Sequence, residues 1–340
     1  MSLRMRRLGR TSLSVSEIGF GAAPIGNLFA KMSDAEAEAT LQAAWDAGLR
    51  YFDTAPLYGF GLSEERLGRF LRTKPRKDFV VSSKVGRILK PNTGWHEQRE
   101  FFIEAGLFEP VFDYSYDGIM RSFEDSLERL GLDRIDILLM HDVGAATHGA
   151  AHRETMRIAM EGGYRAMDAL RREEQVQAIG IGANEWQVCA EAMERGSWDM
   201  FLLAGRYTLL EQEPLQSFFP LCEKAGAGIV IGGPFNSGIL ATGAVDGAHF
   251  DYGAAPEDVL ARVRRIDAVC RAHGVPLPAA ALQFPLAHPL VASVIPGVAG
   301  RAQLDSALDY ARRSIPSALW SDLKREGLLP ANAPLPEGRS

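Results

Sequence analysis

The stretch Arg50–Gly59, RYFDTAPLYG, contains a short apolar strand that ends on a carboxylate, Asp53, and then enters a proline-containing loop that carries Tyr58. An unpaired carboxylate at the end of a buried strand costs free energy, so a cationic partner is expected nearby. Two later apolar strands end on basic residues, the first on Lys84 and the second on His141. The sequence therefore predicts a scaffold that brings the ends of three successive strands together.

That scaffold is indicated by a repeated pattern in which a short apolar strand is followed by an amphipathic helix. Such repeats are typical of a parallel sheet covered by helices, and eight of them close a barrel whose interior is filled by side chains. The alternative is an open sheet that binds a dinucleotide through G-x-G-x-x-G. The sequence has two candidate G-x-G turns, at residues 19–21 and 180–182. Both lack the third glycine of the motif, because Pro24 and Glu185 occupy that position. We therefore predict an α/β fold, the (β/α)8 TIM barrel.

The predicted strands span residues 18–20, 51–53, 79–84, 135–140, 176–181, 199–203, 228–231 and 291–295. The predicted helices span residues 34–47, 63–71, 117–130, 154–174, 185–195, 214–225, 256–273, 278–287 and 302–312.

Two segments fall outside this repeat. Residues 5–18 predict a small N-terminal β-hairpin. Residues 91–116 form an unusually long, aromatic connection after the third strand, and connections of that length are usually functional or disordered. Because the aromatic content argues against disorder, we expect this loop to lie over the face where Lys84 emerges and to contact a substrate.

Composition limits the possible partners and compartments. The chain has 340 residues, a net charge of −6 and a pI near 5.7, which give no general attraction to nucleic acid or an anionic membrane. No apolar run follows the basic start, so neither a signal peptide nor a membrane anchor is expected. Cys189, Cys222 and Cys270 fit no metal-binding spacing and predict free thiols in a reducing cytoplasm. We expect one domain over residues 1–340 and no metal, and the composition is compatible with an oligomer.

The chemistry of the strand ends favours acid–base catalysis. A buried Lys84 ammonium needs a partner, and Asp53 is the obvious one. A cation close to Tyr58 lowers the pKa of its phenol from the ordinary value of about 10, and His141 can hydrogen-bond a substrate oxygen. Each residue alone has a simpler interpretation, as a core histidine, a turn cap, a rim lysine or a packing tyrosine. Together they predict a phenolic general acid–base.

In the contexts FDTAPLYG, SSKVG and LLMHD, these four residues resemble the catalytic tetrad of the aldo-keto reductase family. The resemblance covers almost the whole chain and implies a (β/α)8 barrel that transfers hydride between a nicotinamide cofactor and a carbonyl or hydroxyl carbon. The stretches LLAGRYTLLEQ (202–212) and GGPFNSGILATG (232–243) resemble the aldose 1-dehydrogenase branch. This implies oxidation of a small aldose such as L-fucose to its lactone. The alternatives are a pyridoxal 4-dehydrogenase and a cofactor-sensing regulatory subunit on the same fold.

The resemblance also implies cofactor and substrate contacts. It assigns the nicotinamide carboxamide to Asn184, although the preceding family serine is Ala183 here and two further ring-clamping residues of the family have no counterpart. The segment after the eighth strand should hold the phosphates at a helix N-terminus. Neutral residues where the family has basic ones predict that NAD is preferred, with NADP tolerated through Arg301. The implied cofactor contacts are Gly21, Asp53, Asn184, Gly232, Ile295, Gly297 and Arg301, and the implied substrate contacts are Tyr58, Trp95, His141 and Trp186.

Overall fold

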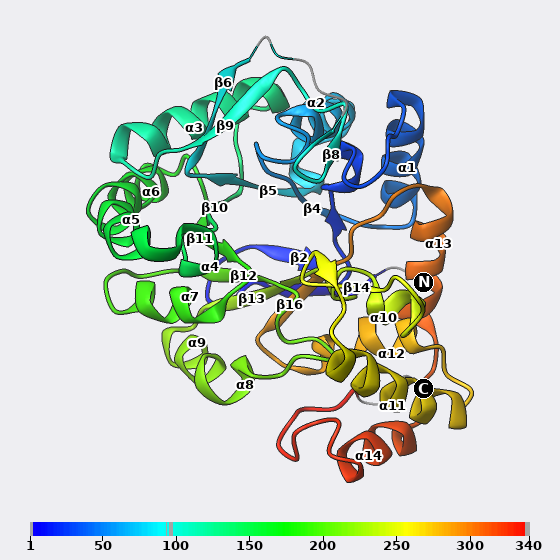
Figure 1. The fold of residues 1–340 in the computed structure, drawn as a ribbon. Coiled ribbons are helices and arrows are strands. Elements are labelled where there is room, and N and C mark those ends of the chain that lie inside the picture. The colour runs from blue at the N-terminus through cyan, green and yellow to red at the C-terminus, as the bar shows by residue number, and fades with distance from the viewer. Residues whose placement is uncertain (1–2, 93, 95–97, 337–340) are drawn as a thin grey trace.

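Eight short parallel strands form the centre of the computed structural model, which describes residues 3–92, 94 and 98–336 (Figure 1). Their order is β16-β13-β12-β11-β10-β5-β4-β3, so each strand pairs with its neighbour in sequence among the barrel strands. Bridges from Ile18 to Val294 and from Gly21 to Gly297 join the first strand to the last and close the barrel. The predicted (β/α)8 fold is confirmed.

The barrel strands are β3 (Phe20–Gly21), β4 (Tyr51–Asp53), β5 (Val80–Val85), β10 (Ile137–His141), β11 (Ala178–Ala183), β12 (Met200–Ala204), β13 (Gly228–Gly232) and β16 (Val291–Ile295).

Side chains alternate between the barrel interior and the helix layer, as the two-residue period of a strand requires. In β4, Tyr51 belongs to the interior cluster and Phe52 to the outer core. The antiparallel hairpin of β1 (Met5–Arg7) and β2 (Ser14–Ser16) confirms the predicted N-terminal hairpin. Its Leu8, Leu13 and Val15 pack into the interior cluster and close that end of the barrel. The opposite end, where the strands finish, is left for the site.

Helices surround the barrel on its outer face (Figure 1). They include α1 (Asp34–Asp46), α2 (Leu62–Leu71), α3 (Tyr116–Leu130), α4 (Ala145–His148), α5 (His152–Ile158), α6 (Tyr164–Arg172), α7 (Trp186–Met193), α8 (Pro214–Ser217), α9 (Phe219–Ala225), α10 (Ile239–Thr242), α11 (Glu257–Ala272), α12 (Leu277–Gln283), α13 (Arg301–Arg312) and α14 (Ser317–Arg325). The predicted helix over residues 154–174 is interrupted by a π-helical turn, Ala159–Gly163. This turn contains Gly162, which packs closely against the start of α3. A Cβ at Gly162 would lie only 2.8 Å from the Tyr116 nitrogen, so this close packing accounts for the break.

The aromatic segment after β5 is more regular than predicted. Strand β6 (Arg87–Pro91) pairs antiparallel with β9 (Phe108–Phe112), and β7 (Gln98–Arg99) pairs with β8 (Phe102–Ile103). The long connection predicted after the third strand is present, and it contains short strands that the sequence did not indicate. The reason is that the ladder depends on pairing between segments that are distant in sequence. We call β6 and β9 the ribbon.

The three cysteines are buried free thiols, as predicted. Within the described part of the chain, every helix is too short or too polar to cross a lipid bilayer.

Candidate active site

Strand register places three predicted site residues inside the same end of the barrel. Asp53 lies opposite Ser82 of β5, and Lys84 lies opposite Leu139 of β10. Leu139 belongs to the interior cluster, and His141 follows it by two residues and therefore points the same way. Alternation along short strands thus brings a carboxylate, an ammonium and an imidazole to one opening.

Lys84 and Asp53 form a buried ion pair. The Lys84 Nζ lies 2.7 Å from Asp53 Oδ2 and also donates to the Thr54 carbonyl oxygen at 2.9 Å. The other oxygen of Asp53 accepts a hydrogen bond from the Ser82 hydroxyl at 2.7 Å. Burial alone lowers the pKa of Lys84, but Asp53 and Tyr58 together raise it above its ordinary value. The lysine therefore stays charged.

Tyr58 is held close to this ion pair by the loop after β4. The Lys84 Nζ lies 4.6 Å from the centroid of the Tyr58 ring, and the His141 ring meets it edge-on at 6.1 Å. The loop turns at Gly59, which has a φ of +65°. Any side chain at this position would clash with the backbone of Gly26. Burial raises the pKa of Tyr58 to about 12, Lys84 opposes that rise and Asp53 adds to it. We expected the cation to lower this pKa overall, but burial outweighs it and the phenol is protonated at neutral pH.

His141 is neutral in this environment. Burial, followed by the charges of Arg87 and Lys84, lowers its pKa well below the ordinary value. Its carbonyl oxygen accepts a 2.6 Å hydrogen bond from the Tyr114 hydroxyl. The imidazole can therefore act as a hydrogen-bond donor or acceptor toward a substrate without carrying charge.

Aromatic side chains from two other segments lie near the opening, and the sequence did not predict one of them. Tyr252 occupies the turn between β14 (His249–Phe250) and β15 (Gly253–Ala254) and stacks on Phe101 with ring centroids 5.4 Å apart. Burial of its hydroxyl raises the pKa of Tyr252, and a hydrogen bond with Asn184 lowers it in part. Arg206 anchors the turn through two hydrogen bonds to Asp251, at 3.0 and 2.9 Å. The only sequence signal for this residue is the turn-forming Asp-Tyr-Gly after the seventh strand.

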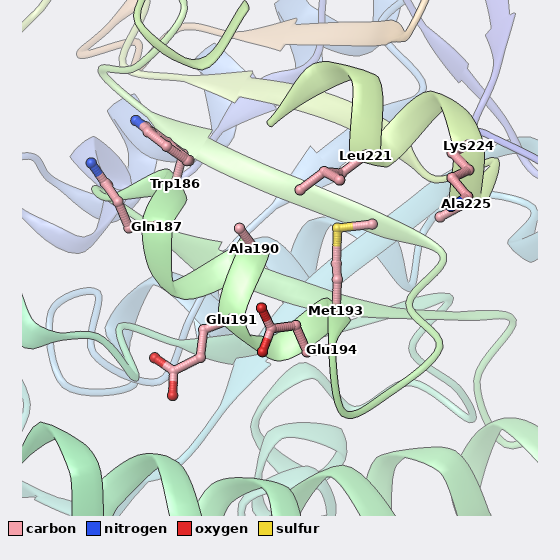
Figure 2. A pocket seen from close by; sticks show the side chains of 9 residues that line it. All are labelled: Trp186, Gln187, Ala190, Glu191, Met193, Glu194, Leu221, Lys224 and Ala225. Carbon is pink, nitrogen blue, oxygen red and sulfur yellow. The ribbon is translucent and has the colours of Figure 1, made fainter. Parts of the chain in front are cut away.

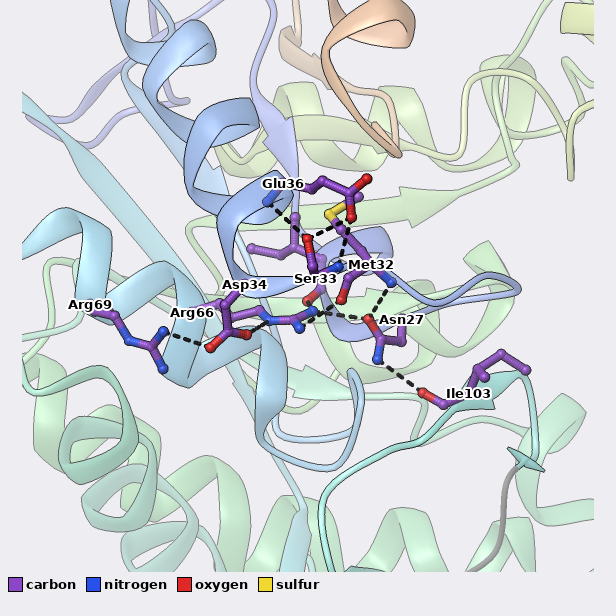
Figure 3. Close-up of polar contacts among 9 residues, drawn as sticks. Asn27, Met32, Ser33, Asp34, Glu36, Arg66, Arg69 and Ile103 are labelled. Atoms are coloured by element: carbon purple, nitrogen blue, oxygen red, sulfur yellow. Dashed lines mark hydrogen bonds and ion pairs between the residues drawn. The ribbon is translucent and has the colours of Figure 1, made fainter.

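A buried arginine fixes the loops on the other side of the opening (Figure 3). Arg66 donates to the carbonyl oxygens of Ile25 and Met32 at 2.7 and 2.8 Å and pairs with Asp34 at 2.8 Å. It also donates to the Asn27 side chain, which in turn donates to the Ile103 carbonyl oxygen at 3.0 Å. This network ties the loop after β3 to β8 and so sets the position of the neighbouring aromatic residues.

The implied cofactor contacts lie along the carboxyl-terminal edge of the barrel. Gly21 pairs with Asp53 and bridges to Gly297, while Gly232 pairs with Ile295. Asn184 follows β11 directly and donates to the Ala204 carbonyl oxygen at 3.4 Å. These residues are therefore adjacent to one another and to the ion pair.

Helix α13 begins beside this edge with an unusual N-terminus. Its N-cap, Gly300, offers no side-chain hydrogen bond, and its first turn contains no acidic residue. Backbone N–H groups in such a turn can bind an anion such as a phosphate. Arg301 is exposed and donates from Nε to both carboxylate oxygens of Asp305, at 2.9 and 2.8 Å.

Of the two tryptophans implied as substrate contacts, only Trp186 belongs to the described residues. Trp95 lies outside the described residues. Trp186 packs on Phe218 with ring centroids 6.3 Å apart and lines a groove between α7 and α9, together with Met193 and Leu221 (Figure 2). The Tyr58 ring has its own ring contacts, with Phe102 and His141.

Comparison with known proteins places this geometry in a family. The model of the Aldo/keto reductase family matches residues 17–325. Pyridoxal 4-dehydrogenase of Microbacterium luteolum is 44% identical over 95% of this chain and 97% of its own length. D-threo-aldose 1-dehydrogenase of a Pseudomonas species is 45% identical over 94% of this chain and 96% of its own length. Among solved structures, the holo form of an aldo-keto reductase from Bacillus halodurans has a TM-score of 0.75 at 23% identity and covers 98% of each chain, which supports the fold.

Proposed function

This chain belongs to the aldo/keto reductase family, and on that premise we propose that it oxidises the hemiacetal carbon of a small aldose, such as L-fucose, to the lactone. Membership makes it an NAD(P)-dependent oxidoreductase. The observation that carries the proposal is the inward-facing group of Asp53, Lys84, Tyr58 and neutral His141. The full-length similarity to an aldose dehydrogenase favours the sugar substrate.

Each residue of the group has a distinct part in the oxidation. A nicotinamide cofactor, when bound at this opening, would supply the acceptor for the hydride of the hemiacetal carbon. The phenolate form of Tyr58, a minor population at neutral pH, takes the proton from the hydroxyl on that carbon as the C=O bond of the lactone forms. Lys84 stabilises the developing negative charge on the phenol oxygen, and Asp53 holds the lysine. His141 hydrogen-bonds the substrate oxygen and so aligns it with Tyr58.

We assign the cofactor to the carboxyl-terminal edge of the barrel. The amide of Asn184 suits a nicotinamide carboxamide, and Gly21, Gly232 and Gly297 lie along the same edge. The open N-terminus of α13 suits the phosphates. NAD is the proposed cofactor because Asp305 already engages Arg301, and NADP is tolerated through the same arginine.

Pyridoxal is the second candidate substrate, favoured by the 44% identical relative. It also closes into a cyclic hemiacetal, and oxidation at that carbon gives a lactone by the same steps. The aromatic residues Phe101 and Tyr252 offer faces for either ring. The two relatives are equally similar to this chain within one per cent of identity and of coverage. The sugar is kept as the first candidate because residues 202–212 and 232–243 resemble the aldose 1-dehydrogenase branch, and the substrate panel below decides between the two.

The test is NADH formation with a panel of aldoses and pyridoxal, followed by identification of the product. Lactone from an aldose supports the proposal, and lactone from pyridoxal alone selects the second candidate. Tyr58→Phe should lower kcat by about 10² or more with little change in cofactor affinity, because general acid–base catalysis contributes on that scale. Tyr164→Phe is the matched control, since that hydroxyl accepts from the Ser197 nitrogen in the helix layer. Near-normal turnover by Tyr58→Phe would refute the assignment of the base.

A further inference from the structure

A second buried ion pair lies directly beside His141. Asp142 follows the histidine and adopts a left-handed backbone with φ of +48°, and its N–H donates to the Gly182 carbonyl oxygen at 2.9 Å. Its Oδ2 lies 2.7 Å from the Arg87 guanidinium, and the two side chains are only 18% and 10% exposed. A non-glycine residue with positive φ is uncommon and invites a functional explanation.

The ribbon holds Arg87 in place. Arg87 is the first residue of β6, and its register partner in β9 is Phe112. The guanidinium carbon lies 4.5 Å from the centroid of the Phe112 ring, and the Ser122 hydroxyl donates to the Arg87 carbonyl oxygen at 3.3 Å. The arginine is thus fixed from two sides, so the carboxylate that it binds is fixed as well.

The carboxylate of Asp142 faces the histidine ring. Its Oδ2 lies 3.4 Å from His141 Nε2, a charge contact without hydrogen-bond geometry, so a proton on Nε2 can still be donated to a substrate oxygen. The other ring nitrogen, Nδ1, is buried and has no hydrogen-bond partner among residues 3–92, 94 and 98–336. Burial raises the pKa of Asp142, and the charge and hydrogen bond of Arg87 oppose that rise and favour the ionised form.

This arrangement distinguishes the two tautomers of the neutral imidazole. An ionised carboxylate only accepts hydrogen bonds, so it favours the tautomer with the proton on Nε2. The opposite tautomer would direct the Nε2 lone pair at a negative charge and leave the Nδ1 proton buried without an acceptor. Only the Nε2–H tautomer can donate a hydrogen bond from Nε2 to a substrate oxygen.

We propose that Asp142, held by Arg87, is a positioning residue that keeps His141 in the Nε2–H tautomer and in the orientation that presents this proton to the substrate oxygen. The proposal rests on the proposed function for its use of His141 in the reaction. The tautomer itself needs no substrate, so it can be tested separately.

The first experiment is ¹⁵N spectroscopy of the histidine rings in the full chain, with the His141 signals assigned from His141→Asn. We expect the wild type to show a protonated Nε2 and an unprotonated Nδ1. Asp142→Asn should move His141 toward the Nδ1–H tautomer, because an amide can donate to Nε2. A wild-type Nδ1–H ring, or an unchanged tautomer in Asp142→Asn, would overturn the proposal.

The second experiment is kinetic. Asp142→Asn should lower kcat/KM by about 10- to 100-fold, the scale of a misplaced catalytic group, with NAD affinity unchanged. Arg87→Lys should retain more activity than Arg87→Met, since it keeps the charge beside Asp142. Asp199→Asn is the matched control, because Asp199 forms a similarly buried pair with Arg171 at 2.8 Å, where β12 begins, at the other end of the barrel.

The outcomes separate the two proposals. A loss of activity in Asp142→Asn that Asp199→Asn does not share, together with the tautomer change, supports the positioning role. Equal losses in both variants, with the His141 tautomer unchanged, would mean that Asp142 is merely structural and would overturn it. A wild type with the Nε2–H ring that oxidises none of the panel substrates defeats the proposed function and leaves the positioning of His141 supported.

Discussion

Replacing Lys84 by methionine tests the central electrostatic argument. The Lys84 Nζ lies 4.6 Å from the centroid of the Tyr58 ring, and at an effective dielectric constant of about 20 this separation corresponds to about 3–4 kcal/mol of attraction for a phenolate. Removing the cation therefore reduces the population of the phenolate, and of any transition state that resembles it, by a few hundredfold. We expect kcat for oxidation to fall by about 10² or more.

The assay must separate this effect from misfolding. Lys84→Met leaves Asp53 buried and unpaired, which destabilises the fold by roughly 3–5 kcal/mol. The double variant Asp53→Asn/Lys84→Met removes both charges and should recover stability in urea unfolding while kcat stays low. If Lys84→Met, or the folded double variant, turns over within threefold of the wild type at neutral pH, the phenolate argument is refuted.

The same geometry fixes the pH dependence. Because burial raises the pKa of Tyr58 to about 12, the phenol is protonated throughout the neutral range. As a proton acceptor it improves when pH rises, so the rate of oxidation should increase between about pH 7 and 10. Reduction needs the protonated phenol, which is already the main form at neutral pH. The rate of reduction should therefore not increase between about pH 7 and 10. Profiles of kcat in the two directions, measured with one enzyme preparation, check the sign, and an oxidation rate that falls across this range contradicts it.

Three further predictions concern cofactor choice, the opening and stability. Asp305→Asn should release Arg301 and improve kcat/KM for NADP relative to NAD by roughly tenfold, since it removes a like charge beside the 2′-phosphate; an unchanged ratio would mean that the phosphate binds elsewhere. Tyr252→Ala should raise KM for substrate by about tenfold, the scale of a lost aromatic contact, and Tyr252→Phe should retain the stacking part; a KM unchanged in both would remove Tyr252 from the site. Burial lowers the pKa of His288 to about 4 in the folded chain. In the unfolded chain this histidine binds a proton already below about pH 6.5, so the free energy of unfolding decreases as pH falls from about 6.5 to about 4. His288→Leu should reduce that loss by about 1–2 kcal/mol in urea titrations at pH 7.5 and 5, and an identical loss in both proteins would count against it.

The strand-end residues could be predicted because their placement depends on local rules. Asp53, Lys84 and His141 each end an apolar strand, and a two-residue period fixes which way each one points. The closure of the sheet into a barrel follows from the number of repeats, so the fold was predictable at the same level.

The rest of the site depends on contacts between distant segments. Arg87 meets Asp142 only because the ribbon pairs in one particular register, and a single sequence does not reveal such pairing. Tyr252 reaches the opening through a hairpin within a long connection that carries no helix or strand pattern. The contact between Trp186 and Phe218 likewise joins segments that are distant in sequence.

The closure between β3 and β16 has a consequence for how the chain folds. Its hydrogen bonds include one from the Ser293 hydroxyl to the Ser16 carbonyl oxygen, which spans 277 residues, and two backbone bonds at Val294. Contacts of such long range form slowly, because the loop entropy must be lost before they contribute. During synthesis the ribosome must therefore release nearly the whole chain before β3 gains its second neighbour. Nascent chains that stop before Val291 expose two unpaired strand edges, which favours aggregation.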